Sequence, residues 1–156
     1  MKTKHLTLAL IIFFSASTIY ALSTNPPAEK AKKDYSVNKA SLIAELTKNI
    51  EYDNAKSSIR QKYNFNLNRL AKLVIDDNYV VSLRGHADSI GKYKPNWILS
   101  DYRAIAVKKY LIKKGVKEDR IVSTPFGSTV PIASNKTSTG RQKNRRVEIE
   151  LKEIGK

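Results

Sequence analysis

The chain has 156 residues with no cysteine, and its 29 Lys and Arg against 14 Asp and Glu give a formal net charge of +15. The absence of cysteine excludes a disulfide framework, a thiol nucleophile and a cysteine-based metal site. The positive charge favours a polyanionic partner, such as nucleic acid, anionic lipid or an acidic polymer, or else serves only solubility.

Residues 1–21 have the layout of a signal peptide, with two lysines near the start, an apolar run over residues 6–14 and then small residues. We expect cleavage after Ala21 or Ser23, which removes the two lysines and leaves a mature charge of +13. Export argues against nucleic acid as the partner. The alternative is an uncleaved membrane anchor, for which the apolar run is shorter than the roughly 20 residues that a span needs.

Residues 22–44 are polar, contain lysines and two prolines, and show little apolar periodicity, which predicts a flexible linker. Residues 45–156 are then expected to form one folded domain.

Within this domain, hydrophobic periodicity predicts four strands and two helices. In chain order they are a strand at Ile50–Asp53, a helix at Ser58–Asp77, a strand at Tyr79–Leu83, a helix from Asn96 to about Lys114, a strand at Arg120–Ser123 and a strand at Arg146–Leu151. Residues 132–144 are expected to form a long polar loop without structure of its own. The order β-α-β-α-β-β predicts an α+β two-layer sandwich, with a mixed four-stranded sheet and both helices packed on one face.

An acid and a base flank the turn between the second strand and the second helix. Asp88 follows the strand, whereas Arg103 falls inside the apolar stripe of the helix, between Leu99 and Val107. A buried guanidinium requires a partner, because removing an unpaired charge from water costs several kcal/mol. Asp88 is the nearest candidate, and the two residues form either an internal salt bridge or the two ends of a clamp for a zwitterion.

Several motifs at these positions resemble the OmpA-like C-terminal domain family, of the OmpA/Pal/MotB type. The resemblance covers residues 45–152, and the matching residues are Ile50–Asp53, Gly85–Gly91, Asn96, Leu99, Ser100, Arg103, Ala104, Tyr110, Leu111, Gly115, Val116, Phe126, Gly127, Pro131, Asn135 and Gly140–Val147. The family implies non-covalent binding of peptidoglycan through the diaminopimelate residue of the stem peptide, which anchors the protein to the Gram-negative cell wall.

The resemblance also implies a set of binding residues. Asp88 would accept hydrogen bonds from the ammonium of diaminopimelate, and Arg103 would donate to its carboxylate. Asn96, Asn144 and Arg145 are expected to line the same site. On this basis, Asp88→Ala and Arg103→Ala should each abolish sedimentation with cell-wall sacculi and leave the circular dichroism unchanged.

Other roles remain open for some of these residues. Asn96 is also a good helix N-cap residue. Asn144 and Arg145 lie in a segment where Arg141 and Arg146 would equally serve to pin the long loop to the sheet.

The resemblance predicts a periplasmic, wall-associated protein with no cofactor and no catalytic activity, and it leaves attachment to the outer membrane open. Other envelope proteins are conceivable partners, and membrane contact is expected only through an uncleaved signal segment. His86 and Asp88 are too few ligands for a metal site, and no nucleophile elbow is present. The alternative function is a membrane-tethered wall anchor of the MotB kind, although residues 5–22 lack the acid that such a helix normally carries.

Overall fold

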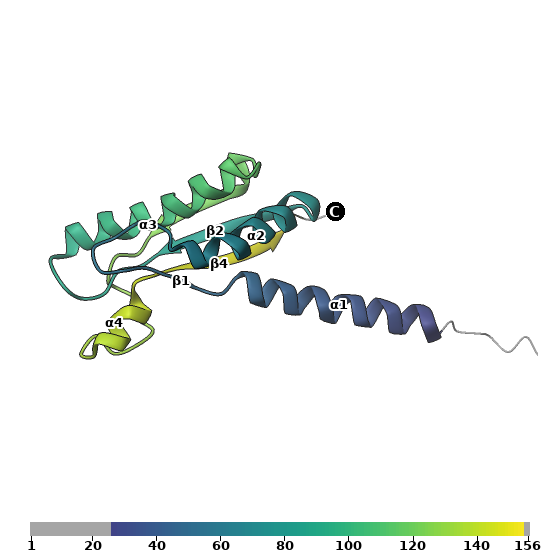
Figure 1. Cartoon of the computed structure of the whole chain (residues 1–156), viewed down its shortest axis with the longest axis horizontal. Coiled ribbons are helices and arrows are strands. Elements are labelled where there is room, and N and C mark those ends of the chain that lie inside the picture. Colours follow the sequence, from purple (N-terminus) through teal and green to yellow (C-terminus); the bar gives the residue numbers. More distant parts are fainter. Residues whose placement is uncertain (1–25, 155–156) are drawn as a thin grey trace, which may run out of the picture. The chain divides into compact units, whose positions relative to one another are not determined.

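The computed structural model describes residues 26–154, in which four strands and four α-helices alternate (Figure 1). The elements are α1 (Pro26–Leu46), β1 (Ile50–Glu51), α2 (Asn64–Asp76), β2 (Tyr79–Gly85), α3 (Tyr93–Lys113), β3 (Ile121–Pro125), α4 (Ser138–Asn144) and β4 (Arg146–Glu153), with single 3₁₀ turns at Gln61–Tyr63 and Glu118–Arg120. The expected signal peptide and its cleavage sites lie outside the described residues. Within residues 26–154, no helix has the length and apolar character that crossing a membrane would require.

The four strands form one mixed sheet in the order β1-β4-β2-β3. β2 and β3 are parallel, whereas β4 runs antiparallel to both of its neighbours, β1 and β2. The sheet confirms the predicted arrangement: α2 and α3 each connect two strands that point the same way, whereas β4, which follows α4, runs in the opposite direction and lies between β1 and β2.

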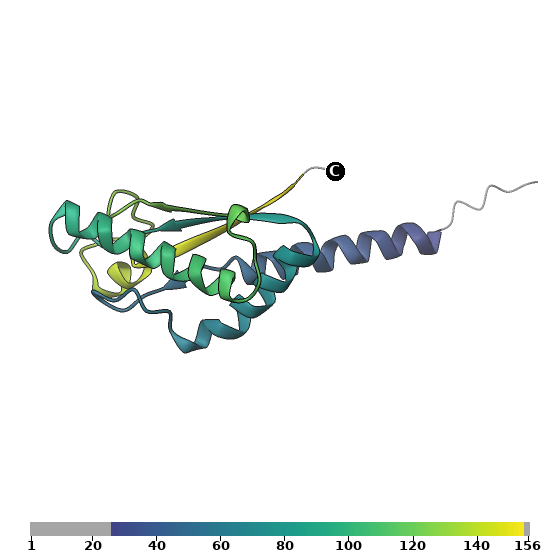
Figure 2. The ribbon, with the colours of Figure 1, turned by 90° about the horizontal axis from the view of Figure 1, so that it is seen from above.

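The strict alternation along β2 explains why both crossover helices pack on one face of the sheet. Residues 79, 81, 83 and 85 are buried, and the three residues between them are partly exposed. The core joins these positions to α2 and α3 through fully or almost fully buried side chains, among them Leu67, Leu70, Val74, Ala104, Val107 and Leu111. Figure 2 shows α3 running lengthwise along the sheet.

Residues 22–44, for which a flexible linker is predicted, are helical from Pro26 onward in their described part. Proline is well tolerated in the first turn of a helix, and the alanines, lysines and glutamate that follow are good helix formers. Only the C-terminal end of α1 carries apolar residues at helical spacing, and there Leu42 and Leu46 pack against the core. The earlier part offers no apolar stripe, so its sequence gives no periodic signal.

The prediction of an unstructured loop at 132–144 is wrong, because α4 occupies its second half. The Thr137 side chain caps α4 by accepting a hydrogen bond from the Gly140 N–H at 3.0 Å. A β-carbon at Gly140 would lie 1.9 Å from the Ser134 carbonyl oxygen, so the loop and helix meet at a point where only glycine fits.

Figures 1 and 2 agree that α4 and the first turns of α3 lie at the same end of the sheet. β2 also ends there, and it crosses α3 closely: a β-carbon at Gly85 would lie 1.9 Å from the Ser100 carbonyl oxygen. This contact fixes where α3 begins relative to the end of β2, and the turn that carries Asp88 lies between them.

Candidate functional site

Asp88 lies in the turn after β2 and is 4% exposed. Its Oδ1 accepts the Ile90 N–H at 3.0 Å, and its Oδ2 accepts a hydrogen bond from Arg145 Nη1 at 2.7 Å. The internal salt bridge of this carboxylate is therefore made with Arg145, which immediately precedes β4. The alternative that Asp88 and Arg103 pair with each other is not what the structure shows.

Arg103 is fully buried, and its guanidinium donates to three backbone carbonyls in place of a carboxylate. Nε donates to Lys56 at 2.9 Å, Nη1 to His86 at 2.9 Å and Nη2 to Asp53 at 3.2 Å. Carbonyl dipoles thus take the place of a direct ion pair, while the negative charge of Asp88 acts on Arg103 without a hydrogen bond and tends to raise its pKa. Burial lowers the pKa of Arg103 to about 10, so the side chain stays charged at neutral pH.

Of the remaining predicted residues, Asn96 and Arg145 bond to the turn that carries Asp88, whereas Asn144 bonds to the loop before α4. Asn96 donates from Nδ2 to the carbonyls of Asp88 and Ile90, at 3.1 and 3.0 Å, and so fixes the turn; it is not the helix N-cap, because α3 begins three residues earlier. Arg145 holds Asp88 and also donates to the Tyr52 carbonyl at 3.2 Å.

Asn144 is fully buried and contributes to the loop rather than to the site. Its Oδ1 accepts the N–H groups of Ile132 and Ala133, and its Nδ2 donates to the Ala133 carbonyl and to Asn135 Oδ1, all at 2.8–3.0 Å. Arg141 and Arg146 also bond to carbonyls of the segment from Val130 to Lys136, which confirms that they pin it.

Two adjoining cavities open at this end of the sheet. The first, the Arg103 cavity, has a volume of about 210 Å³ and is lined by Asn54, Ala55, Ala87, Asp88, Ile90, Asn96, Leu99, Arg103 and Arg145. The second, the Arg141 cavity, has a volume of about 320 Å³ and is lined by Asn54, Asp88, Ile90, Ser138, Arg141 and Arg145. Asp88, Arg103, Asn96 and Arg145 therefore line one cavity, and Asn144 lies outside both linings.

Asp88 and Arg103 both retain hydrogen-bonding capacity toward a ligand. A guanidinium has five N–H donors, and Arg103 uses three of them, which leaves one on each terminal nitrogen. A carboxylate offers about four acceptor positions, and Asp88 uses one on each oxygen. The Arg103 cavity thus presents a fixed anion and a fixed cation that are not bonded to each other.

Sequence reasoning missed the residues that the β1–α2 loop and α4 contribute to the cavities, namely Asn54, Ala55 and Ser138. The sequence indicates a turn at the Asp53-Asn54 pair, and this is the one feature that points to the β1–α2 loop. Ala55 has a φ of 53°, a left-handed conformation that is costly for alanine, and it holds this loop at the wall of the Arg103 cavity. Among residues 26–154, no three His, Cys, Asp or Glu side chains gather as a metal site would require.

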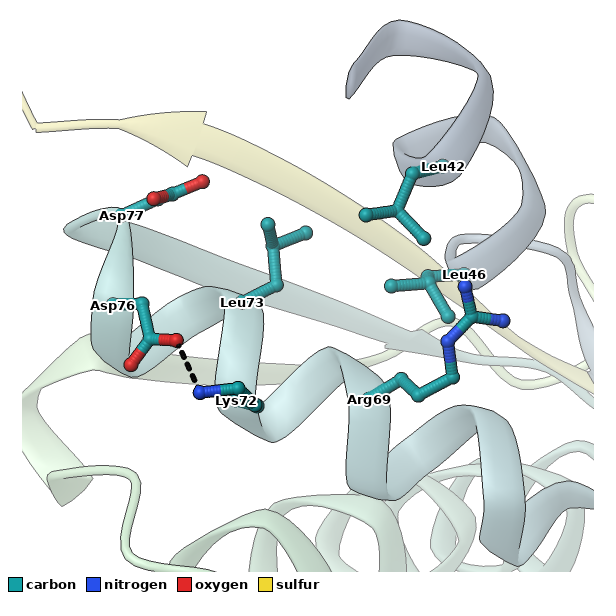
Figure 3. A pocket seen from close by; sticks show the side chains of 7 residues that line it. All are labelled: Leu42, Leu46, Arg69, Lys72, Leu73, Asp76 and Asp77. Atoms are coloured by element: carbon teal, nitrogen blue, oxygen red, sulfur yellow. Dashed lines mark hydrogen bonds and ion pairs between the residues drawn. The ribbon is translucent and has the colours of Figure 1, made fainter. Parts of the chain in front are cut away.

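A third cavity, between the C-terminal end of α1 and α2, has a different character (Figure 3). Its floor is Leu42, Leu46 and Leu73, and charged residues surround it. Those charges are matched within the protein: Lys72 pairs with Asp76 at 2.8 Å, Arg69 with Glu45 at 2.8 Å and Lys39 with Asp77 at 3.2 Å. This cavity therefore offers no fixed charge for a zwitterion.

A model of the OmpA family matches residues 51–145. The chain belongs to the OmpA family. This confirms the resemblance seen in the motifs between Ile50 and Val147. The outer membrane protein A of Bordetella avium is 36% identical to this OmpA-family chain over 128 residues, which cover 81% of the chain and 64% of that protein.

Two further similarities cover the same domain. The peptidoglycan-binding protein ArfA of Mycobacterium bovis is 46% identical over 84 residues, 53% of this chain and 26% of ArfA. The crystal structure of the C-terminal domain of Helicobacter pylori MotB is 31% identical, covers 69% of this chain and 85% of that domain, and has a TM-score of 0.62. The chain spans less than two thirds of the length of both sequence relatives, the Bordetella protein and ArfA.

Proposed function

We propose that this OmpA-family chain binds peptidoglycan non-covalently through the diaminopimelate residue of the stem peptide, and so anchors itself to the Gram-negative cell wall in the periplasm. The observation that carries the proposal is the pair of opposite charges in the Arg103 cavity, Asp88 and Arg103, each bonded to other groups and each with capacity to spare. The name of the relative ArfA, a peptidoglycan-binding protein, supports the choice of polymer.

The free end of diaminopimelate carries an ammonium and a carboxylate on one carbon, so it matches such a pair. The ammonium would donate to Asp88, and the carboxylate would accept from the two free N–H groups of Arg103. Asn96 Oδ1, which has no hydrogen-bond partner among the described residues, provides a further acceptor for the ammonium. Binding in this mode needs no covalent step and no cofactor.

Three roles follow for the other predicted residues. Asn96 fixes the turn that carries Asp88, Arg145 orients the Asp88 carboxylate, and Asn144 holds the loop that precedes α4. We therefore expect Asn144 to affect binding only through the stability of that loop.

The test is sedimentation of Asp88→Asn with purified sacculi. Asparagine preserves the size of the side chain and an acceptor for the Ile90 N–H, but it removes the negative charge, so we expect at least a tenfold loss of affinity. The matched control is Asp101→Asn, which removes a carboxylate from α3 outside both cavities. Equal sedimentation of Asp88→Asn and the wild type would contradict the proposal.

A further inference from the structure

The two cavities hold more positive charge than a zwitterion can neutralise. Among the described residues that line them, Asp88 is the only acid, whereas Arg103, Arg141 and Arg145 are all bases. Asp88 and Arg145 neutralise each other through their 2.7 Å ion pair. Arg103 and Arg141 bond only to backbone carbonyls, so both of their charges stay without a counter-ion.

Two further acids, Asp53 and Glu51, are paired outside this cleft, the space that the two adjoining cavities form. Asp53 pairs with Arg60 at 2.7 Å, and this hydrogen bond lowers the pKa of Asp53. Glu51 lies 4.0 Å from the same arginine and also accepts a hydrogen bond from Gln142 at 3.3 Å. Neither acid lines a cavity. A bound head group of diaminopimelate has no net charge, so it would leave the cleft with an excess of two positive charges.

The Arg141 cavity also has hydrogen-bond donors that the protein does not use. Both bonds of Arg141 start at Nη1 and reach the carbonyls of Asn135 and Lys136, at 2.9 and 3.2 Å, which leaves Nε and Nη2 without partners among the described residues. The side chains of Ser138 and Asn54 likewise have no partner in that part of the chain, and both line this cavity. A guanidinium edge beside a hydroxyl and an amide suits a carboxylate.

The two cavities adjoin, because Asn54, Asp88, Ile90 and Arg145 line both. A ligand held by Asp88 in the Arg103 cavity can therefore reach Arg141 without leaving the cleft. We propose that the Arg141 cavity binds a second carboxylate of the same stem peptide, with Arg141 as its principal donor and Ser138 as a minor one. This inference rests on the proposed function, and it makes Arg141 a determinant of specificity for peptide over free diaminopimelate.

A stem peptide offers two sources for this carboxylate: the C-terminal carboxylate, and the α-carboxylate of the γ-linked glutamate that precedes diaminopimelate. Calorimetric titration of the full chain would compare free diaminopimelate, a stem tetrapeptide with both carboxylates free, and two tetrapeptides that each carry one of them as a carboxamide. The variants are Arg141→Gln, Arg141→Lys and Ser138→Ala, and the control is Lys143→Gln, which removes a cation from α4 that lines neither cavity.

We expect Arg141→Gln to weaken tetrapeptide binding about tenfold and to leave the affinity for free diaminopimelate unchanged. Arg141→Lys should keep more of the affinity for the tetrapeptide than Arg141→Gln does, and Ser138→Ala should lose less of it. Lys143→Gln should weaken the binding of all ligands only slightly. The wild type should bind one of the two carboxamide peptides about as weakly as Arg141→Gln binds the tetrapeptide. Arg141→Gln should bind that carboxamide peptide and the tetrapeptide equally well, and the carboxylate replaced in that peptide would then be the one that Arg141 binds.

The inference is overturned if Arg141→Gln binds the tetrapeptide as tightly as the wild type does. It is also overturned if the affinity of this variant for free diaminopimelate falls as much as its affinity for the tetrapeptide, because Arg141 would then only support the loop at residues 135–136. Failure of the wild type to bind any of the four ligands would instead overturn the proposed function, and the inference with it.

Discussion

Arg103 uses three of its N–H groups to hold the carbonyls of Asp53, Lys56 and His86, which belong to two separate loops. The side chain is therefore a structural support as well as the proposed carboxylate ligand. Helical spacing alone indicates that this arginine is buried, because it lies between Leu99 and Val107. Spacing cannot indicate which groups surround it, because two of its three partners come from a loop about 50 residues earlier in the chain.

This dual role changes what Arg103→Ala is expected to do. The substitution leaves three carbonyls without their donor, so the free energy of unfolding should fall by about 3 kcal/mol or more, measured by urea denaturation. Arg120→Ala is the control, since Arg120 donates to one carbonyl, that of Val74, at 3.3 Å, and should cost about 1 kcal/mol. Equal stabilities of Arg103→Ala and the wild type would show that the three bonds do not support the fold.

His86 should make the stability of the domain depend on pH. Its ring is 2% exposed, stacks on Phe126 with centroids 5.2 Å apart, and has no hydrogen-bond partner on either nitrogen among the described residues. Burial, followed by the charge of Arg146, lowers the pKa of His86 to about 4, although Glu148, with an oxygen 3.6 Å from Nε2, opposes this shift.

Between pH 6.5 and 4 the unfolded chain therefore binds a proton at His86 that the folded chain does not. The stability from this group is complete above pH 6.5 and is lost as the pH falls toward 4. We expect the free energy of unfolding to decrease from pH 7 to pH 5 by on the order of 1 kcal/mol. His86→Phe, which keeps an aromatic ring against Phe126, should decrease less over this interval; an identical decrease in both proteins would contradict this assignment.

At the scale of the elements, the sequence was sufficient to locate a helix or strand wherever that segment buries one face against the core. β2, α3 and β4 all alternate or repeat in this way, and their predicted positions agree with the structure to within a few residues at each end. α4 was missed because hydrogen bonds of Thr137, Asn144 and Arg141 hold it in place, and such bonds leave no apolar period in the sequence.

The residues that line the cleft were likewise predicted only in part, because some of them come together through contacts that leave no periodic pattern in the sequence. Asp88 and Arg103 flank the turn from β2 to α3, so local sequence brings them together. Asn54 and Ser138 reach the cavities through long-range packing of the β1–α2 loop and α4, which no spacing within one element reveals.

The close crossing of β2 and α3 gives a test at this scale. Gly85→Ala would place a β-carbon 1.9 Å from the Ser100 carbonyl oxygen, and this contact is to backbone, which cannot rotate away. We expect the free energy of unfolding to fall by about 3 kcal/mol, as for other over-packed core positions, measured by urea denaturation. The control is Ser82→Ala, on the opposite face of β2, with little expected change; a Gly85→Ala protein of wild-type stability would mean that the helix lies farther from the strand.

At the scale of the whole molecule, the net charge of +15 and the proposed site favour the same kind of partner. A surface rich in lysine attracts any polyanion and so cannot by itself distinguish one from another. Selection must come from the few fixed charges in the cleft, because only there does the relative position of an anion and a cation matter. The polymer also offers many copies of the same group, so weak individual contacts would still retain the protein at the wall.

The central claim is that Asp88 and Arg103 together recognise a carbon that carries both an ammonium and a carboxylate. Titration with two muropeptides that differ only at the third residue of the stem, diaminopimelate in one and lysine in the other, tests it most directly. Lysine keeps the ammonium but lacks the carboxylate that would bind Arg103, so we predict at least tenfold weaker binding of the lysine form. Equal affinity for the two muropeptides would contradict the account.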